Sequence, residues 1–229
     1  MTRQAAAQSA ASKSPDGLGL DEAYAVDGPD ANRELYASWA ATYESEFIVE
    51  SRYVYHQQVA EVFCAGMAAF DRPVLDAGCG TGIVGDELAR LGVTVIDGID
   101  ISTEMLAKAG TKTHDSRPTY RQLVEADLTG RIDLADESYD GIVSAGTFTH
   151  GHLGPDTISE LLRVARPGAH CALGINSAHF DEFGFGDWLE QCRADGHITE
   201  LRYELRPIYG SADEADPDQW ARIAVFTVR

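Results

Sequence analysis

The stretch over residues 74–85, which reads VLDAGCGTGIVG, constrains the fold of this chain more than any other segment. It begins as a short apolar run with the length and composition of a buried strand, and this run ends in Asp76. Glycines follow at positions 78, 80 and 82 and predict a tight turn, because glycine readily takes positive φ and lets a ligand approach the backbone. Apolar residues at helical spacing over residues 83–91 complete a strand, a glycine turn and a helix, which are the parts of a nucleotide-binding unit.

A second acid, Asp100, supports this interpretation. It directly follows the next predicted strand, over residues 93–99, and a helical pattern over residues 102–109 comes after it. In a nucleotide-binding sheet, an acid at this position bonds ribose hydroxyls. The glycines at positions 80, 82 and 85 also fit the dinucleotide fingerprint G-x-G-x-x-G, so an NAD(P)-dependent oxidoreductase is an alternative.

The charge of the glycine stretch favours a cationic ligand over a dinucleotide. Residues 74–89 contain no Lys or Arg but carry Asp76, Asp86 and Glu87. A dinucleotide would bring a pyrophosphate to these acids, whereas a ligand with an ammonium and a sulfonium group is attracted to them. S-adenosylmethionine is such a ligand.

The stretch resembles motif I of class I S-adenosylmethionine-dependent methyltransferases, and IDGIDISTEMLAKA over residues 96–109 is similar to the segment that follows this motif. The resemblance covers roughly residues 35–175. It implies a Rossmann-like α/β fold, with a seven-stranded sheet whose last strand is antiparallel and with helices on both faces. Within the family, VLDAGCGTG, ADLT at residues 126–129 and GTFTHGH at residues 146–152 most resemble the methyltransferase-like group related to the Williams–Beuren region protein.

The resemblance implies which residues hold the methyl donor. Asp127 would accept from the exocyclic amine of adenine and Leu128 would lie on the ring face, although a solvated turn acid is the alternative for Asp127. The predicted donor-binding residues are Tyr36, Trp39, Tyr43, Asp76, Gly78, Gly80, Gly82, Asp100, Ile101, Asp127, Leu128, Ala145 and Thr147.

The N-terminal part of the chain predicts a cap. Residues 34–47 repeat aromatic side chains at helical spacing, and Tyr36, Trp39 and Tyr43 resemble the Y-x-x-W-A-x-x-Y opening of many small-molecule methyltransferases. An amphipathic helix that only packs on the domain is the alternative. Residues 1–32 predict a disordered tail or a partial lid, and residues 33–229 a single domain with a helical cap over 33–70 and an α/β core over 71–229.

The predicted catalytic residue is His150. Methyl transfer from a sulfonium is an in-line displacement, so holding the nucleophile and the methyl carbon in line supplies much of the acceleration. A hydroxyl acceptor also needs a base, and histidine is suited to this near neutral pH. His150 follows a predicted strand over residues 140–145, at the sheet edge where such folds bind ligands. A loop histidine that only bonds backbone is the alternative, and His152, His179 and Tyr43 are further candidates.

Composition restricts the partners. The net charge of −19 over 229 residues disfavours nucleic acid and anionic membranes, so a small-molecule substrate is the default, with a monomer or a homodimer both open. The absence of an apolar run long enough to span a membrane, or of a signal-like N-terminus, leads us to expect a cytoplasmic protein. Four scattered cysteines predict neither a metal site nor disulfides.

The sequence thus predicts a methyltransferase that uses S-adenosyl-L-methionine and acts on an unidentified small molecule. The acceptor atom, O, N, S or C, is open, and specificity is expected in the tail, the aromatic helix and a loop over residues 176–185. One alternative is a non-catalytic protein that binds the donor or regulates another. An oxidoreductase is disfavoured because Lys13, Lys108 and Lys112 place no lysine in the predicted site.

Overall fold

The computed structural model describes residues 33–34, 37, 44, 48–49, 52–149, 153–210 and 216–229. Several sequence predictions therefore lie outside the described residues: the tail over residues 1–32, the donor contacts Tyr36, Trp39 and Tyr43, and the histidines His150 and His152. The remaining predicted site residues are all described.

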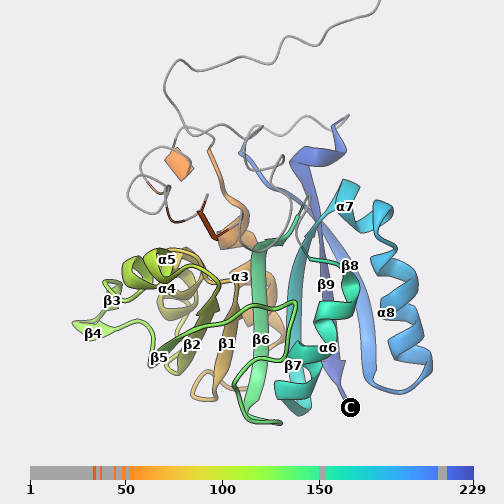
Figure 1. Cartoon of the computed structure of the whole chain (residues 1–229), viewed down its shortest axis with the longest axis horizontal. Helices are drawn as coiled ribbons and strands as arrows, with labels where there is room; N and C mark the ends of the chain where they lie inside the picture. Colours follow the sequence, from red (N-terminus) through yellow and green to blue (C-terminus); the bar gives the residue numbers. More distant parts are fainter. Residues whose placement is uncertain are drawn as a thin grey trace, which may run out of the picture.

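A seven-stranded sheet forms the centre of the molecule (Figure 1). In chain order its strands are β1 (Val74–Ala77), β2 (Ile96–Asp100), β5 (Gln122–Glu125), β6 (Tyr139–Phe148), β7 (Ala165–Asn176), β8 (Ile198–Pro207) and β9 (Trp220–Val228). Their order in the sheet is β5-β2-β1-β6-β7-β9-β8, and β9 runs antiparallel to both of its neighbours while the other pairs are parallel. This confirms the predicted Rossmann-like fold with an antiparallel last strand.

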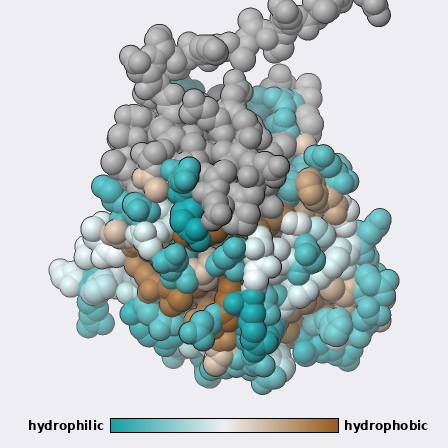
Figure 2. Space-filling model, viewed as in Figure 1, coloured by the Kyte–Doolittle hydropathy of each residue, from teal (hydrophilic) through white to brown (hydrophobic). Residues whose placement is uncertain are grey.

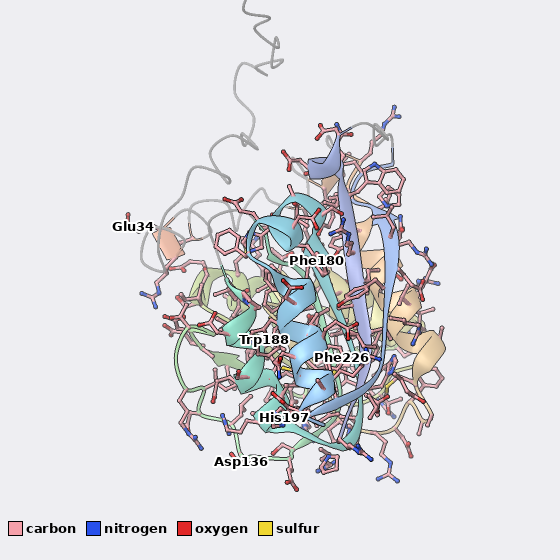
Figure 3. All side chains as sticks on the ribbon, turned by 90° about the vertical axis from the view of Figure 1, so that its right-hand side faces the viewer. Glu34, Asp136, Phe180, Trp188, His197 and Phe226 are labelled. Carbon is pink, nitrogen blue, oxygen red and sulfur yellow. The ribbon has the colours of Figure 1, made fainter. Side chains whose placement is uncertain are left out.

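Helices cover both faces of the sheet, as predicted. One face carries α3 (Tyr55–Gly66), α4 (Ile83–Arg90) and α5 (Thr103–Ala109), and the other carries α6 (Ile158–Val164), α7 (Ser177–Glu182) and α8 (Phe185–Ala194). Each layer seals its own buried cluster, with Phe63, Leu88 and Leu106 on the first face and Ile158, Phe185 and Leu189 on the second. Figure 3 shows α8 and α3 on opposite sides of β8 and β9.

The burial of β1 explains why the glycine stretch begins with apolar residues. All four residues of β1 are buried, because helices cover both faces of this parallel strand. Successive side chains alternate between the faces, so Val74 joins one core cluster and Leu75 joins the other. Asp76 therefore faces the layer of α3, α4 and α5, and β1 continues for one residue beyond it, whereas the sequence predicted that the strand ends at Asp76.

Short elements complete the described chain. These are the hairpin β3 (Thr113–His114) and β4 (Arg117–Pro118) and the 3-10 helices η2 (Pro155–Thr157) and η3 (Pro217–Gln219). Within the described ranges, no helix is both long enough and apolar enough to cross a membrane. The face seen in Figure 2 is mostly hydrophilic, with small hydrophobic areas between the polar side chains.

Two predictions about local structure are wrong. Residues 176–185 are not a loop, because α7 occupies Ser177–Glu182 and α8 already begins at Phe185. The Asn176 side chain starts α7 by accepting from the backbone N–H groups of Ala178 and His179, a capping signal that the aromatic character of the segment conceals. The strand predicted over residues 140–145 is also longer than expected, since β6 continues to Phe148 through a register shift.

The described residues of the predicted cap over residues 33–70 fall into two parts, the helix α3 and the residues that precede it. α3 packs against α4 and against β6 and β7, so it lies in the helical layer of the core. Residues 33 and 44 contact the rim of the sheet further along the chain, as described below. The boundary at residue 70 remains a prediction.

Candidate donor-binding site

The predicted site residues gather at the carboxyl ends of neighbouring strands. β1 has β2 on one side and β6 on the other, so the order of the strands reverses at β1, and ligands of open α/β sheets bind at such a switch point. The glycine turn follows β1, Asp100 ends β2, Asp127 follows β5 and Thr147 lies near the end of β6. The fold thus brings together residues that are as many as 70 positions apart in the chain.

The glycine turn needs its glycines for two different reasons. Gly78, Gly80 and Gly82 have φ values of +70°, +53° and +87°, which disfavour other residues. At Gly78 a Cβ atom would also lie 2.0 Å from Oγ1 of Thr147, whose hydroxyl donates to the carbonyl oxygen of Ala77 at 3.1 Å. Around a Cβ built on Gly80, by contrast, no described atom lies within 4 Å, so the backbone there is open to close approach.

Asp100 is tied directly to this turn. Its Oδ2 accepts from the Gly80 N–H at 2.8 Å and its Oδ1 accepts from the Ser102 N–H at 2.9 Å. Burial raises the pKa of this carboxyl, and the backbone N–H groups of Ser102, Gly80 and Ile101 partly offset the rise. A carboxylate has about four lone-pair sites, so each oxygen keeps capacity for a ribose hydroxyl.

Asp76 lies deeper than Asp100. Its side chain is 0% exposed, and its Oδ2 accepts from the Tyr120 hydroxyl at 2.7 Å. The pKa of Asp76 is raised to about 7, mainly by burial and also by the neighbouring Asp100, although the Tyr120 hydrogen bond and the nearby Gly85 N–H lower it. Sequence reasoning missed Tyr120, because a single tyrosine before a strand carries no motif.

Asp127 and Leu128 make local contacts. Oδ1 of Asp127 accepts from the backbone N–H of Thr129 at 2.8 Å and from its hydroxyl at 2.7 Å, as in an Asx turn. Leu128 is buried in the core cluster that α6 and α8 cover. These contacts agree with the alternative of a turn acid, and the adenine contact of both residues remains a prediction.

Two described residues of the segment before α3 lie at the rim of the site. The Arg33 Nε atom donates to the carbonyl oxygen of Ile101 at 3.3 Å, directly after Asp100. Glu44 pairs with the Lys112 ammonium group at 2.8 Å. Ile101 and Ala145, both predicted donor contacts, are half-buried at this rim.

The charge argument from the sequence is corrected by these contacts. Lys112 also lies 3.3 Å from the Asp86 carboxylate, so a lysine is present beside the first turn of α4. Glu87 is paired with Arg90 at 2.5 Å, and Asp76 is buried with a raised pKa. The surroundings of the glycine turn therefore carry less negative charge than the count of Asp and Glu in the sequence indicates.

His179 has the surroundings of a core residue. It is 0% exposed, its Nε2 lies 2.9 Å from the carbonyl oxygen of Leu153, and its ring centroid lies 4.3 Å from that of Phe183. A general base must reach the acceptor, so these contacts argue against His179 as the base. Within the described residues, no group of three or more His, Cys, Asp and Glu side chains could hold a metal ion.

Comparison with known proteins agrees with this geometry. Residues 75–173 match the sequence model of a family described as "Methyltransferase domain". An O-methyltransferase of Pyrenophora dematioidea is 30% identical over 173 residues, which cover 62% of this chain and 61% of the relative, less than two thirds of its length.

Solved structures share the fold over nearly the whole chain. The magnesium protoporphyrin IX methyltransferase (ChlM) from Synechocystis PCC 6803 with bound SAH has a TM-score of 0.63 at 19% identity, covering 88% of this chain and 99% of its own. The [4+2]-cyclase SpnF has a TM-score of 0.63 at 15% identity, covering 89% of this chain and 97% of its own. Residues 75–173 are therefore similar to a methyltransferase domain, and the chain shares the fold of class I S-adenosylmethionine-dependent methyltransferases.

Proposed function

We propose that this protein is an S-adenosylmethionine-dependent methyltransferase that transfers the methyl group in line to a small molecule. The observation that supports the proposal most is the tie between the glycine turn and Asp100, whose two oxygens accept from the N–H groups of Gly80 and Ser102. This acid stands at the strand end where nucleotide-binding sheets bond ribose, beside a turn whose backbone is open to a ligand.

The chain's own residues would bind and orient the donor, which supplies the methyl group on its sulfonium. Asp100 would accept from the ribose hydroxyls, and Asp127 and Leu128 would contact the adenine. Asp76 would attract the cationic end, and the half-buried Ala145 and Thr147 would border the position of the methyl group. Binding in this way fixes the line of attack, which is the main contribution that positioning makes to such a displacement.

A hydroxyl on a small molecule is the acceptor that we favour. The relative from Pyrenophora dematioidea is named an O-methyltransferase, and the net charge of −19 disfavours nucleic-acid substrates. The finer resemblance to the group related to the Williams–Beuren region protein rests on three short sequence stretches and remains part of this proposal. A hydroxyl acceptor would lose its proton to a base, for which His150 remains the prediction.

Donor binding can be tested directly by calorimetry with S-adenosylmethionine, its demethylated product and NADH. We expect the first two to bind in the micromolar range, which is roughly −8 kcal/mol. Radiolabelled donor incubated with a small-molecule extract would then report transfer. Tight binding of NADH without binding of either adenosyl compound would contradict the proposal.

His150→Ala tests the catalytic prediction. If His150 is the base, turnover on a hydroxyl acceptor should fall about 10²–10⁴-fold while donor affinity stays nearly unchanged. The wild-type rate should also rise with pH through a histidine-like pKa, and the variant should lose this dependence. His197→Ala is the matched control. His197 is exposed and directly precedes β8, at the end of the sheet opposite to the candidate donor-binding site (Figure 3).

A second candidate function is binding of the donor without methyl transfer. The [4+2]-cyclase SpnF shares this fold, so the fold alone does not determine the reaction. Such a protein would bind S-adenosylmethionine in the calorimeter and transfer no label to any fraction of the extract.

A further inference from the structure

Tyr120 occupies a space that three glycines leave free. Measured from a Cβ atom built on each glycine, the Tyr120 side chain would lie 2.9 Å away at Gly82, 2.3 Å away at Gly85 and 2.9 Å away at Gly98. These glycines belong to the turn, to α4 and to β2 respectively. The ring of Tyr120 is thus enclosed by the elements that build the donor site, and a side chain at any of the three positions would displace it.

The hydroxyl of Tyr120 has one hydrogen-bond acceptor, Asp76. It donates to Oδ2 at 2.7 Å and so fixes one oxygen of this buried carboxyl. The other oxygen, Oδ1, is also buried and has no hydrogen-bond partner among the described residues. The Gly85 N–H favours the ionised carboxylate and so lowers its pKa. It does not reach hydrogen-bonding geometry with Oδ1.

A buried carboxylate oxygen without a donor is rare, because desolvation is not offset. Such unsatisfied groups are retained at sites that bind a ligand, where the ligand supplies the missing contact. Asp76 lies in the last half of β1, immediately before the glycine turn, so a cationic group bound at the turn could supply it.

We propose that Tyr120 is a positioning residue of the donor site, whose ring supports the glycine turn and whose hydroxyl holds Asp76 so that Oδ1 stays available to the cationic end of the donor. This inference rests on the proposed function, because it assumes that the ligand is S-adenosylmethionine. Tyr120 itself touches no reacting atom. It acts through Asp76 and through the glycines that surround its ring.

The charge state of Asp76 gives this role a measurable signature. Burial raises the pKa of Asp76 to about 7, and the bond from Tyr120 is the largest influence that lowers it. The groups around the carboxyl are the Tyr120 hydroxyl, the Cys79 thiol, the Asp100 carboxylate and the Gly85 N–H. Burial keeps the pKa of Cys79 well above its usual value, so this thiol is neutral in the relevant range. Removing the tyrosine hydroxyl should therefore raise the pKa of Asp76 further.

The chain offers a matched control in Tyr139. Its hydroxyl also donates to a buried aspartate, Asp97, at 3.0 Å. Asp97 keeps three further hydrogen bonds from Arg121 and Gln122 when that hydroxyl is removed, and it lies on the opposite face of the sheet. Tyr120→Phe and Tyr139→Phe thus each remove a hydroxyl that donates to a buried aspartate. The first aspartate belongs to the candidate donor site and the second lies outside it.

The experiment measures the dissociation constant of S-adenosylmethionine by calorimetry between pH 6 and pH 9 for the wild type and both variants. We expect Tyr120→Phe to weaken binding about tenfold or more at pH 7.5, and to move the midpoint of the pH dependence upward by about one unit or more. Tyr139→Phe should bind within about twofold of the wild type with an unchanged midpoint. An unchanged midpoint in Tyr120→Phe, or an equal shift in Tyr139→Phe, would overturn the proposal.

A double-mutant cycle with Asp76→Asn shows whether Tyr120 acts through Asp76. If it does, the double variant Tyr120→Phe/Asp76→Asn should bind the donor as Asp76→Asn does, whereas additive losses would overturn the proposal.

Urea unfolding of the ligand-free protein against pH gives a readout that does not depend on the donor, and it keeps the test valid if the wild type binds no donor. The Asp76-linked fall in stability should continue to a higher pH in Tyr120→Phe, because only the folded-state pKa changes. A fall that ends at the same pH as in the wild type would overturn the role of Tyr120, while a failure of donor binding in the wild type would count against the proposed function alone.

Discussion

Asp76 and Asp97 are buried aspartates on neighbouring strands with different surroundings. Their side chains are 0% and 1% exposed, and the pairing of Asp76 with Gly98 and of Leu75 with Asp97 directs them to opposite faces of the sheet. Asp97 accepts two hydrogen bonds from Arg121, one from Gln122 and one from Tyr139, whereas Asp76 accepts one from Tyr120. The protein itself satisfies Asp97, and it leaves one oxygen of Asp76 without a partner among the described residues.

Under the proposed function, this difference separates a structural carboxylate, Asp97, from one that is kept for a ligand, Asp76. A fully bonded buried carboxylate stabilises its surroundings, whereas an unsatisfied one lowers the stability of the ligand-free protein. Functional sites commonly retain groups whose surroundings disfavour the charged form. Three substitutions test this distinction, beginning with the largest expected effect.

Asp76→Asn should stabilise the ligand-free protein at alkaline pH. The pKa of Asp76 is raised from 3.8 to about 7 on folding, so the folded state holds the proton more tightly than the unfolded state. The resulting stabilisation is complete below about pH 4 and is lost as the pH rises to about 7. The variant should therefore exceed the wild type by up to about 4 kcal/mol at pH 8 and match it near pH 4, measured by urea unfolding. If the wild type were as stable as the variant at pH 8, both oxygens of the Asp76 carboxylate would have hydrogen-bond partners in the ligand-free protein.

Asp97→Ala should have the opposite effect on stability. The hydroxyl of the buried Tyr139 loses its acceptor, and the bonds from Arg121 and Gln122 are lost as well. We expect the free energy of unfolding to fall by about 3 kcal/mol, with donor affinity nearly unchanged in the folded fraction. Urea unfolding and calorimetry on one preparation measure both, and a selective loss of donor affinity would assign Asp97 to the site.

Asp100→Ala should weaken donor binding more than it weakens folding. Loss of charge-assisted bonds to the ribose should reduce the binding free energy by about 2 kcal/mol, or roughly 30-fold in affinity. Glu125→Gln is the matched control, because Glu125 is an exposed acid opposite Asp100 at the end of β5. If both variants lost the same donor affinity, Asp100 would contribute only its negative charge to the rim of the site and no specific bond to the ribose.

The sequence by itself determined the parts of the fold that local patterns encode. The glycine turn after the first strand and the acid at the end of the second lie where their patterns predict, because turn geometry and side-chain periodicity depend on near neighbours in the chain. The seven-stranded sheet and its antiparallel last strand followed from the family resemblance carried by that turn.

The tertiary structure alone decided which side chains meet. Tyr120 and Asp76 are 44 positions apart, and Lys112 and Glu44 are 68 positions apart, so nothing in either local sequence indicates the contact. The contact between Tyr120 and Asp76 forms because β5, β2 and β1 lie side by side with α4 packed against them, and that adjacency is set by packing across the whole domain. For this physical reason the acids could be found from the sequence, whereas the partners that set their charge could not.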